Sequence, residues 1–227
     1  MSEVTTTLSD HYALIMTPLV QTPAGDARLT CIRAHGSRRA TLLLGHGAGG
    51  GIEAADLQAL AAALPAHGVE VVLVEQPWRV AGKRIAPAPK TLDVAWRAVL
   101  EHLHERQGAA GTAPLIVGGR SAGARVACRT GAATGAAAVL ALAFPLHPPG
   151  KPEKTRAGEL TGSGLPTLII QGAADPFGSA AEFPPLPGTH RLVALPAGNH
   201  EFAVRKDQAP VLDTIVDAAA EWINTLF

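Results

Sequence analysis

Short apolar runs typical of strands alternate with runs of helical periodicity along most of this 227-residue chain. The strand candidates are residues 28–34, 40–44, 69–74, 115–118, 137–144, 167–170 and 191–195, and the helix candidates are residues 52–66, 91–107, 121–130 and 207–226. A continuous β-branched run such as residues 69–74 is typical of a strand that is buried on both faces. The alternation predicts an α/β fold, with a mostly parallel sheet and helices on both of its faces.

The length of the chain indicates a single domain over residues 1–227. Two loops stand out, at residues 76–90 and 145–166, and both are too short to form a separate domain or a large lid. Ligands of open α/β sheets bind at the carboxyl ends of the strands. Each candidate motif below follows a predicted strand, so we expect the motifs to meet at that edge of the sheet.

The composition indicates a soluble globular protein, because 47% of the residues are hydrophobic and the formal net charge is zero. A neutral charge balance gives no reason to expect nucleic acid or an anionic membrane as a partner. Residues 1–7 lack the basic and apolar regions of a secretion signal. Cys31 and Cys128 lie in apolar segments without metal or redox spacing, which is consistent with a reducing compartment. We therefore expect a cytoplasmic protein.

The segment Gly119-Arg120-Ser121-Ala122-Gly123 lies between a predicted strand and a predicted helix. A Gly-x-Ser-x-Gly turn in this setting is the signature of a nucleophile elbow, in which a tight turn holds the serine hydroxyl on a strained backbone. The pattern predicts that Ser121 is a nucleophile that attacks an acyl carbon. The alternative is a glycine-rich turn that only lets the helix pack closely against the strand.

A serine nucleophile needs a base, and the base needs an orienting acid. In this kind of fold, the chain order is serine, then acid, then histidine. Asp175 follows the predicted strand 167–170, and His200 follows the predicted strand 191–195. We predict His200 as the general base and Asp175 as the acid. The alternatives are a turn-forming aspartate before Pro176 and a solvated loop histidine.

The oxyanion of a tetrahedral intermediate requires preorganised hydrogen-bond donors. The backbone N–H of Ala122 is one candidate, because Ala122 directly follows the predicted nucleophile. The glycine-rich segment His46-Gly47-Ala48-Gly49-Gly50 follows an early strand, and we predict Ala48 as the second donor, with Gly47 as the adjacent alternative. A phosphate-binding loop is the other interpretation, but the segment lacks the Lys-Ser/Thr ending of a P-loop.

Several basic residues lie where they could border a substrate. The candidates for binding an anionic acyl group or thioester are Arg79, Lys83, Arg84 and Arg120, and exposed charges on a solvated surface are the alternative. His147 follows the strand after the elbow helix and is a further candidate at the pocket border, although a solvent-facing or structural position is the favoured interpretation. The histidine and acid spacings match no metal motif, so we predict neither a metal ion nor another cofactor.

Five segments together resemble the α/β-hydrolase superfamily, and more closely its small dienelactone-hydrolase-like subgroup. They are residues 44–49, 75–84, 118–125, 144–152 and 171–178. Animal relatives of this subgroup are named for testis expression and for a regulatory subunit of a histone acetyltransferase complex. The resemblance implies an eight-stranded, mostly parallel sheet and a triad of Ser121, Asp175 and His200.

These observations predict a serine hydrolase that acts on a small-molecule ester or thioester. An amidase or peptidase with the same triad is one alternative. A catalytically silent scaffold is another, because a fold by itself does not determine function.

Overall fold

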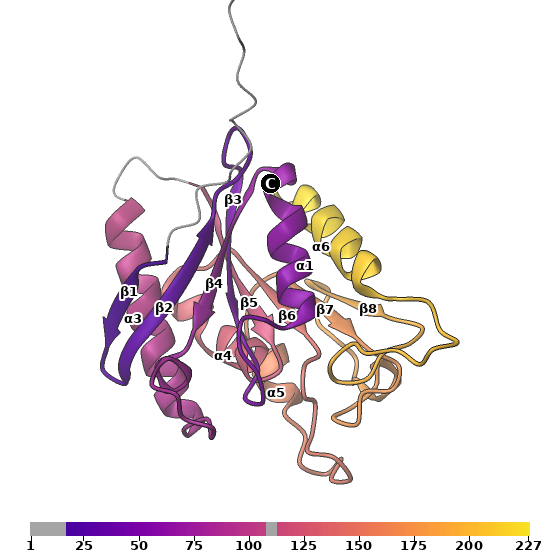
Figure 1. Cartoon of the computed structure of the whole chain (residues 1–227). Coiled ribbons are helices and arrows are strands. Elements are labelled where there is room, and N and C mark those ends of the chain that lie inside the picture. The colour runs from indigo at the N-terminus through magenta and orange to yellow at the C-terminus, as the bar shows by residue number, and fades with distance from the viewer. Residues whose placement is uncertain (1–16, 108–112) are drawn as a thin grey trace, which may run out of the picture.

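The computed structural model describes residues 17–107 and 113–227, which build one eight-stranded sheet with helices on both faces (Figure 1). The strands are β1 (Leu19–Thr22), β2 (Gly25–Ile32), β3 (Ala40–Gly45), β4 (Val69–Glu75), β5 (Leu115–Arg120), β6 (Ala138–Leu142), β7 (Thr167–Gln171) and β8 (His190–Ala194). Their order across the sheet is β1-β2-β4-β3-β5-β6-β7-β8. Strands β3 to β8 run parallel to one another, while β2 is antiparallel to both β1 and β4. The predicted α/β fold is confirmed.

The helices also follow the predicted alternation. They are α1 (Ala55–Ala63), α2 (Pro77–Val80), α3 (Pro89–Gln107), α4 (Ala122–Thr130), α5 (Ala157–Thr161) and α6 (Leu212–Leu226). The helix predicted at residues 52–66 divides into α1 and a 3-10 turn, Leu64–His67, in which Pro65 has no N–H to donate. Helix α6 begins five residues later than predicted, because Pro210 disfavours helical backbone at the residue before it.

The central strands are apolar throughout because helices cover both faces of the sheet. On β3, Leu42 and Leu44 belong to one buried cluster, and Leu43 belongs to the other. This alternation follows from the two-residue period of a strand. Helices α1 and α6 cover the first cluster, and α3 and α4 cover the second (Figure 1). The core is therefore two apolar layers that share one sheet.

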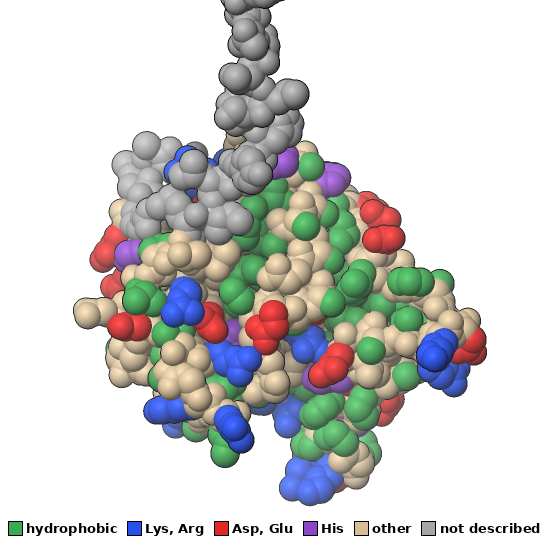
Figure 2. All heavy atoms as spheres, in the orientation of Figure 1, with side chains coloured by type: hydrophobic (Ala, Val, Ile, Leu, Met, Phe, Trp, Pro, Cys, Tyr) green, Lys and Arg blue, Asp and Glu red, His purple; other side chains and the backbone are tan. Residues whose placement is uncertain are grey.

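The surface carries charges of both signs. On the face shown in Figure 2, Lys and Arg side chains lie among Asp and Glu side chains, with no large field of a single sign. Within the described ranges, no helix has the length and apolar character needed to cross a bilayer.

Candidate active site

The turn that carries Ser121 joins the end of β5 to the start of α4. Ser121 has φ 52° and ψ −109°, in a left-handed region that side chains rarely adopt. Such a backbone conformation costs about 1–3 kcal/mol and persists only where the surrounding structure imposes it. One restraint is the Ser121 N–H, which donates a 3.0 Å hydrogen bond to the Leu142 carbonyl at the end of β6. The strain expected of a nucleophile elbow is present at this serine.

The two glycines of the turn are required by the neighbouring strand. A Cβ atom on Gly119 or on Gly123 would overlap the carbonyl oxygen of Gly45, the last residue of β3. A Cβ on Gly118 would lie 2.5 Å from the Leu140 carbonyl oxygen. The glycines therefore allow the helix to pack closely against the strand, as the second sequence interpretation proposed. The strained backbone of Ser121 is present as well, so both features occur in the same turn.

Ser121, His200 and Asp175 form a continuous chain of hydrogen bonds. The Ser121 Oγ lies 2.8 Å from His200 Nε2, and His200 Nδ1 lies 2.8 Å from Asp175 Oδ2. These distances suit proton transfer from the serine hydroxyl to a histidine whose other nitrogen donates to the carboxylate. The structure thus brings together three side chains from the loops after β5, β7 and β8.

Further contacts hold Asp175 and His200 in place. Asp175 is buried, and its carboxylate also accepts hydrogen bonds from Gln171 Nε2 at 2.9 Å and from the Phe177 N–H at 2.8 Å. The Phe177 ring lies 4.2 Å, centroid to centroid, from the His200 imidazole. These contacts limit rotation of both triad partners. Sequence reasoning did not assign Gln171 a role, although it lies at the end of the strand that precedes the acid.

Arg120 occupies a different position from the one expected of a substrate-binding residue. It is buried, and its Nη2 donates to the His200 carbonyl oxygen at 2.5 Å. Its Nε lies 3.4 Å from Oδ2 of Asp56, a buried residue of α1. Burial raises the pKa of Asp56, and the Arg120 guanidinium opposes that rise. Arg120 therefore joins α1 to the loop that carries His200.

The loop after β3 lies against the serine. A Cβ on Gly47 would be 3.5 Å from the Ser121 Cβ, so the loop backbone approaches Ser121 closely. Ala48 and Ala122 line the same small gap in the protein. The N–H of Ala122 is at the first turn of α4, where backbone N–H groups have no partner within the helix. Both predicted donors therefore border one space beside Ser121.

His46 supports this loop in the neutral state. Burial lowers its pKa. Its Nδ1 donates to the Gly47 carbonyl at 2.8 Å, and its Nε2 accepts from the Gln76 N–H at 3.1 Å. A neutral imidazole with one donor and one acceptor nitrogen satisfies both contacts.

The other predicted border residues have protein partners or face solvent. Arg79 pairs with Glu53 at 3.2 Å, and Arg84 is exposed. His147 contacts Glu182 at 3.0 Å and the Pro148 carbonyl at 2.9 Å, and the hydrogen bonds to Pro148 and Glu182 raise its pKa. Arg79 and His147 thus have partners of their own, and the structure places neither against Ser121.

No three His, Cys, Asp or Glu side chains within residues 17–107 and 113–227 are grouped so that they could bind a metal ion. The groups that hydrogen bonds bring together at this site are the Ser121 hydroxyl, the His200 imidazole and the Asp175 carboxylate.

Comparison with known proteins agrees with this geometry. A sequence model of the alpha/beta hydrolase domain matches residues 38–226. The chain belongs to the alpha/beta hydrolase family. The superfamily resemblance seen in the sequence is thereby confirmed. No curated protein matches this alpha/beta hydrolase in a sequence search.

Solved structures share the fold of this alpha/beta hydrolase. An alpha-beta serine hydrolase homologue from Coxiella burnetii has a TM-score of 0.70 at 18% identity, covering 93% of this chain and 97% of its own. A serine hydrolase without lid from Xanthomonas campestris has a TM-score of 0.69 at 20% identity, with coverages of 92% and 94%. Dienelactone hydrolase from Anabaena variabilis has a TM-score of 0.70 at 18% identity, with coverages of 94% and 98%. At these identities, the likeness is one of fold.

Proposed function

We propose that this alpha/beta hydrolase is a serine hydrolase that cleaves a small ester or thioester through an acyl-enzyme on Ser121. The observation that carries the proposal is the hydrogen-bonded chain from Ser121 to His200 to Asp175, with both distances at 2.8 Å, on a strained turn. The solved serine hydrolases with this fold add support. We also propose that the chain lies in the dienelactone-hydrolase-like part of the family, in keeping with its likeness to a dienelactone hydrolase structure.

The reaction follows from the positions of these groups. His200 Nε2 accepts the Ser121 proton as Oγ attacks the acyl carbon, and Asp175 stabilises the imidazolium that forms. The N–H groups of Ala48 and Ala122 donate to the oxyanion. His200 then returns the proton to the departing alcohol or thiol. A water molecule, deprotonated by His200, attacks the acyl-enzyme and releases the acid.

A fluorophosphonate probe tests the nucleophile directly. We expect the wild-type protein to be labelled, and Ser121→Ala to remain unlabelled. Ser163→Ala is the matched control, because Ser163 is a buried serine that hydrogen-bonds Thr167 at 3.1 Å and lies outside the triad. If neither the wild type nor the control is labelled, the catalytic proposal fails and a silent scaffold is favoured.

A panel of matched ester, thioester and amide substrates tests the leaving-group class. We expect hydrolysis of the ester and thioester, with loss of activity in Ser121→Ala and His200→Ala. Faster turnover of the amide than of the matched ester would contradict the proposal and indicate an amidase or peptidase.

A further inference from the structure

Gln171, the last residue of β7, is fully buried and contacts the acid of the proposed triad. Its Nε2 lies 2.9 Å from Asp175 Oδ2 and 2.6 Å from the Gly178 carbonyl oxygen. A carboxylate and a backbone carbonyl can only accept hydrogen bonds, so the amide nitrogen is the end that faces them. Each of its two N–H groups then has one acceptor, and the orientation of the amide is determined.

This orientation leaves the other end of the amide without a partner. Gln171 Oε1 is buried and has no hydrogen-bond partner among the described residues. Buried amide oxygens are rarely left in this state. Turning the amide over would place its oxygen against two acceptors, so the cost cannot be avoided by rotation. The two N–H contacts therefore decide how this side chain lies.

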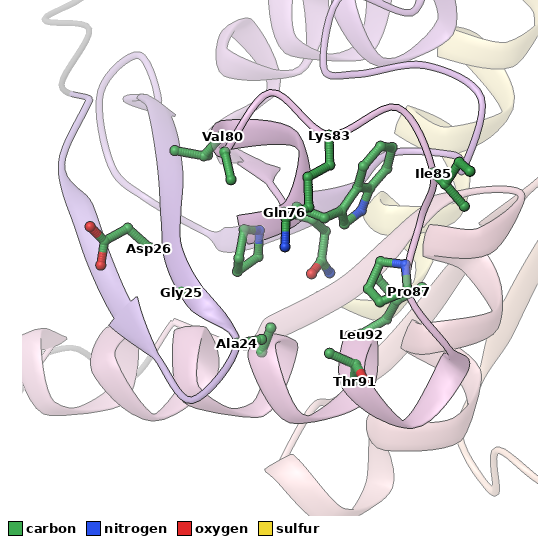
Figure 3. A pocket seen from close by; sticks show the side chains of 14 residues that line it. Ala24, Gly25, Asp26, Gln76, Val80, Lys83, Ile85, Pro87, Thr91 and Leu92 are labelled. Atoms are coloured by element: carbon green, nitrogen blue, oxygen red, sulfur yellow. The ribbon is translucent and has the colours of Figure 1, made fainter.

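A buried amide oxygen without a partner does not by itself indicate a role, as Gln76 illustrates. Gln76 is also buried, and its Oε1 also lacks a partner within the described ranges. Its side chain lines a cavity of about 310 Å³ between the β1–β2 turn, α2 and the start of α3 (Figure 3). Ser121, Asp175 and His200 do not line that cavity. Gln171 differs because its nitrogen makes two contacts in the loop of the acid.

Gln171 also lies where the loop of the acid meets the loop of the histidine. Its backbone carbonyl accepts from the Leu195 N–H at 2.9 Å, where β8 leads into the loop that carries His200. At the next residue, a Cβ on Gly172 would overlap the Gly198 carbonyl oxygen. The two loops are therefore in direct backbone contact beside Gln171, and a small displacement of the acid alters its distance to the histidine.

We propose that Gln171 is a positioning residue, whose amide holds the Asp175 carboxylate in the rotation that accepts from His200 Nδ1. Asp175 Oδ2 accepts from both Gln171 and His200, and the Phe177 N–H donates to the other oxygen. A carboxylate held in this way keeps the imidazole in the tautomer whose Nε2 faces Ser121. The inference rests on the proposed function, because it gives Gln171 a part in the same reaction.

Turnover measurements test the role of the amide. Gln171→Met removes both N–H groups and nearly preserves the side-chain volume, with folding checked by circular dichroism. Because the carboxylate can then rotate, we expect kcat for a p-nitrophenyl ester to fall at least about tenfold, with KM changed by less than about twofold. If Gln171→Met does not fold, Gln171→Asn tests the same contact, because its amide is one methylene shorter and does not reach Asp175 Oδ2.

Ser179→Ala is the matched control for loosening of the loop. It removes the hydrogen bond from Ser179 Oγ to Glu182 at 3.0 Å, directly after Gly178, and leaves both N–H groups of Gln171 in place. We expect its kcat and KM to stay near the wild-type values. An equal loss of kcat in Ser179→Ala and Gln171→Met would overturn the positioning role.

A proton NMR measurement reports on the Asp175–His200 contact without substrate. The His200 Nδ1 proton should give a far-downfield resonance that is absent in His200→Ala. Exchange of this proton with water requires the hydrogen bond to open, so we expect exchange at least about tenfold faster in Gln171→Met than in the wild type and Ser179→Ala. Equal exchange rates, or a wild type without the resonance, would overturn the inference. The proposed hydrolase activity fails separately, through absence of fluorophosphonate labelling.

Discussion

At the scale of single residues, the sequence pattern and the structure agree on the three groups of the proposed triad. Ser121, Asp175 and His200 each follow a strand in the predicted chain order, and the structure brings them into hydrogen-bond contact. The residues that support them were not predictable in the same way. The sequence patterns assigned no role to Gln171 or Asp56, and each acts on a partner through a contact that only folding creates.

The buried Arg120–Asp56 pair leads to a prediction about stability and turnover. Arg120→Met removes the hydrogen bond to the His200 carbonyl, so we expect kcat to fall about tenfold with little change in KM, and Arg120→Lys to recover part of the loss.

Asp56→Asn leaves the guanidinium buried without its carboxylate, and should lower the free energy of unfolding by about 3–5 kcal/mol in urea titrations.

Two control variants separate a loss of His200 positioning from a general loss of stability. Arg97→Met alters an exposed arginine of α3 and should change neither kcat nor stability appreciably. The double variant Asp56→Asn/Arg120→Met should be more stable than Asp56→Asn, because no unpaired charge remains buried. The positioning role would be contradicted if KM and kcat fell together and if the two variants Arg120→Met and Arg120→Lys showed the same fall.

At the scale of elements, the long helices and central strands were predictable, and the shortest elements were not. Periodicity located α3 and the parallel strands to within a few residues. It missed β1, α2 and α5, which are four, four and five residues long. Such segments contain too few residues to display a period, and their conformation depends on what they pack against.

An ion-pair network connects three of these helices. Glu159 of α5 accepts hydrogen bonds from Arg125 and Arg129 of α4, at distances of 2.6–2.8 Å. Arg129 also donates to Asp93 of α3 at 2.6 and 3.0 Å. Burial acts to raise the pKa of Glu159, but the hydrogen bonds and charges of the two arginines outweigh it and lower that pKa below 4.5.

This lowered pKa determines how the contribution of Glu159 varies with pH. A carboxyl whose pKa is lower in the folded state stabilises the protein fully above its unfolded pKa, and that stabilisation is lost as the pH falls through the folded pKa. We expect Glu159→Gln to lower the free energy of unfolding by about 2 kcal/mol at pH 7. This effect should become progressively smaller as the pH falls below 4.5.

Urea unfolding of the wild type and Glu159→Gln across this pH range measures the difference. Glu221→Gln is the control, because Glu221 pairs with Arg191 at an exposed site and should contribute less than 1 kcal/mol. If the difference in the free energy of unfolding between the wild type and Glu159→Gln stayed constant from pH 7 to pH 3, the charge of Glu159 would not be the source of its stabilising effect.

At the scale of the whole molecule, one sheet collects the loops that build the site. The loops after β3, β5, β7 and β8 lie at the carboxyl edge, which is where ligands bind in sheets of this kind. The connection between β6 and β7 contains only the five-residue helix α5, and no large insertion covers the triad within the described residues. The described architecture is that of an open site.

Because the site is open, we expect no increase in the hydrolysis rate of a poorly soluble ester when the ester begins to aggregate. We expect the hydrolysis rate of a p-nitrophenyl ester to follow a single saturation curve through the concentration at which the ester forms micelles. Lids that open at a lipid surface would instead produce a rise in rate at that concentration. Initial rates measured below and above this point, with a soluble short-chain ester as reference, provide the test.

The sequence by itself determined the layered α/β architecture and the chain order of the proposed nucleophile, acid and base. Both are local properties, because hydrophobic period and turn chemistry act over a few neighbouring residues. Only the tertiary structure decided the role of Arg120, which lies within the Gly-x-Ser-x-Gly turn but contacts Asp56 and the His200 loop. These contacts join distant segments, and no pattern along the chain records which of them the packing of the sheet will bring together.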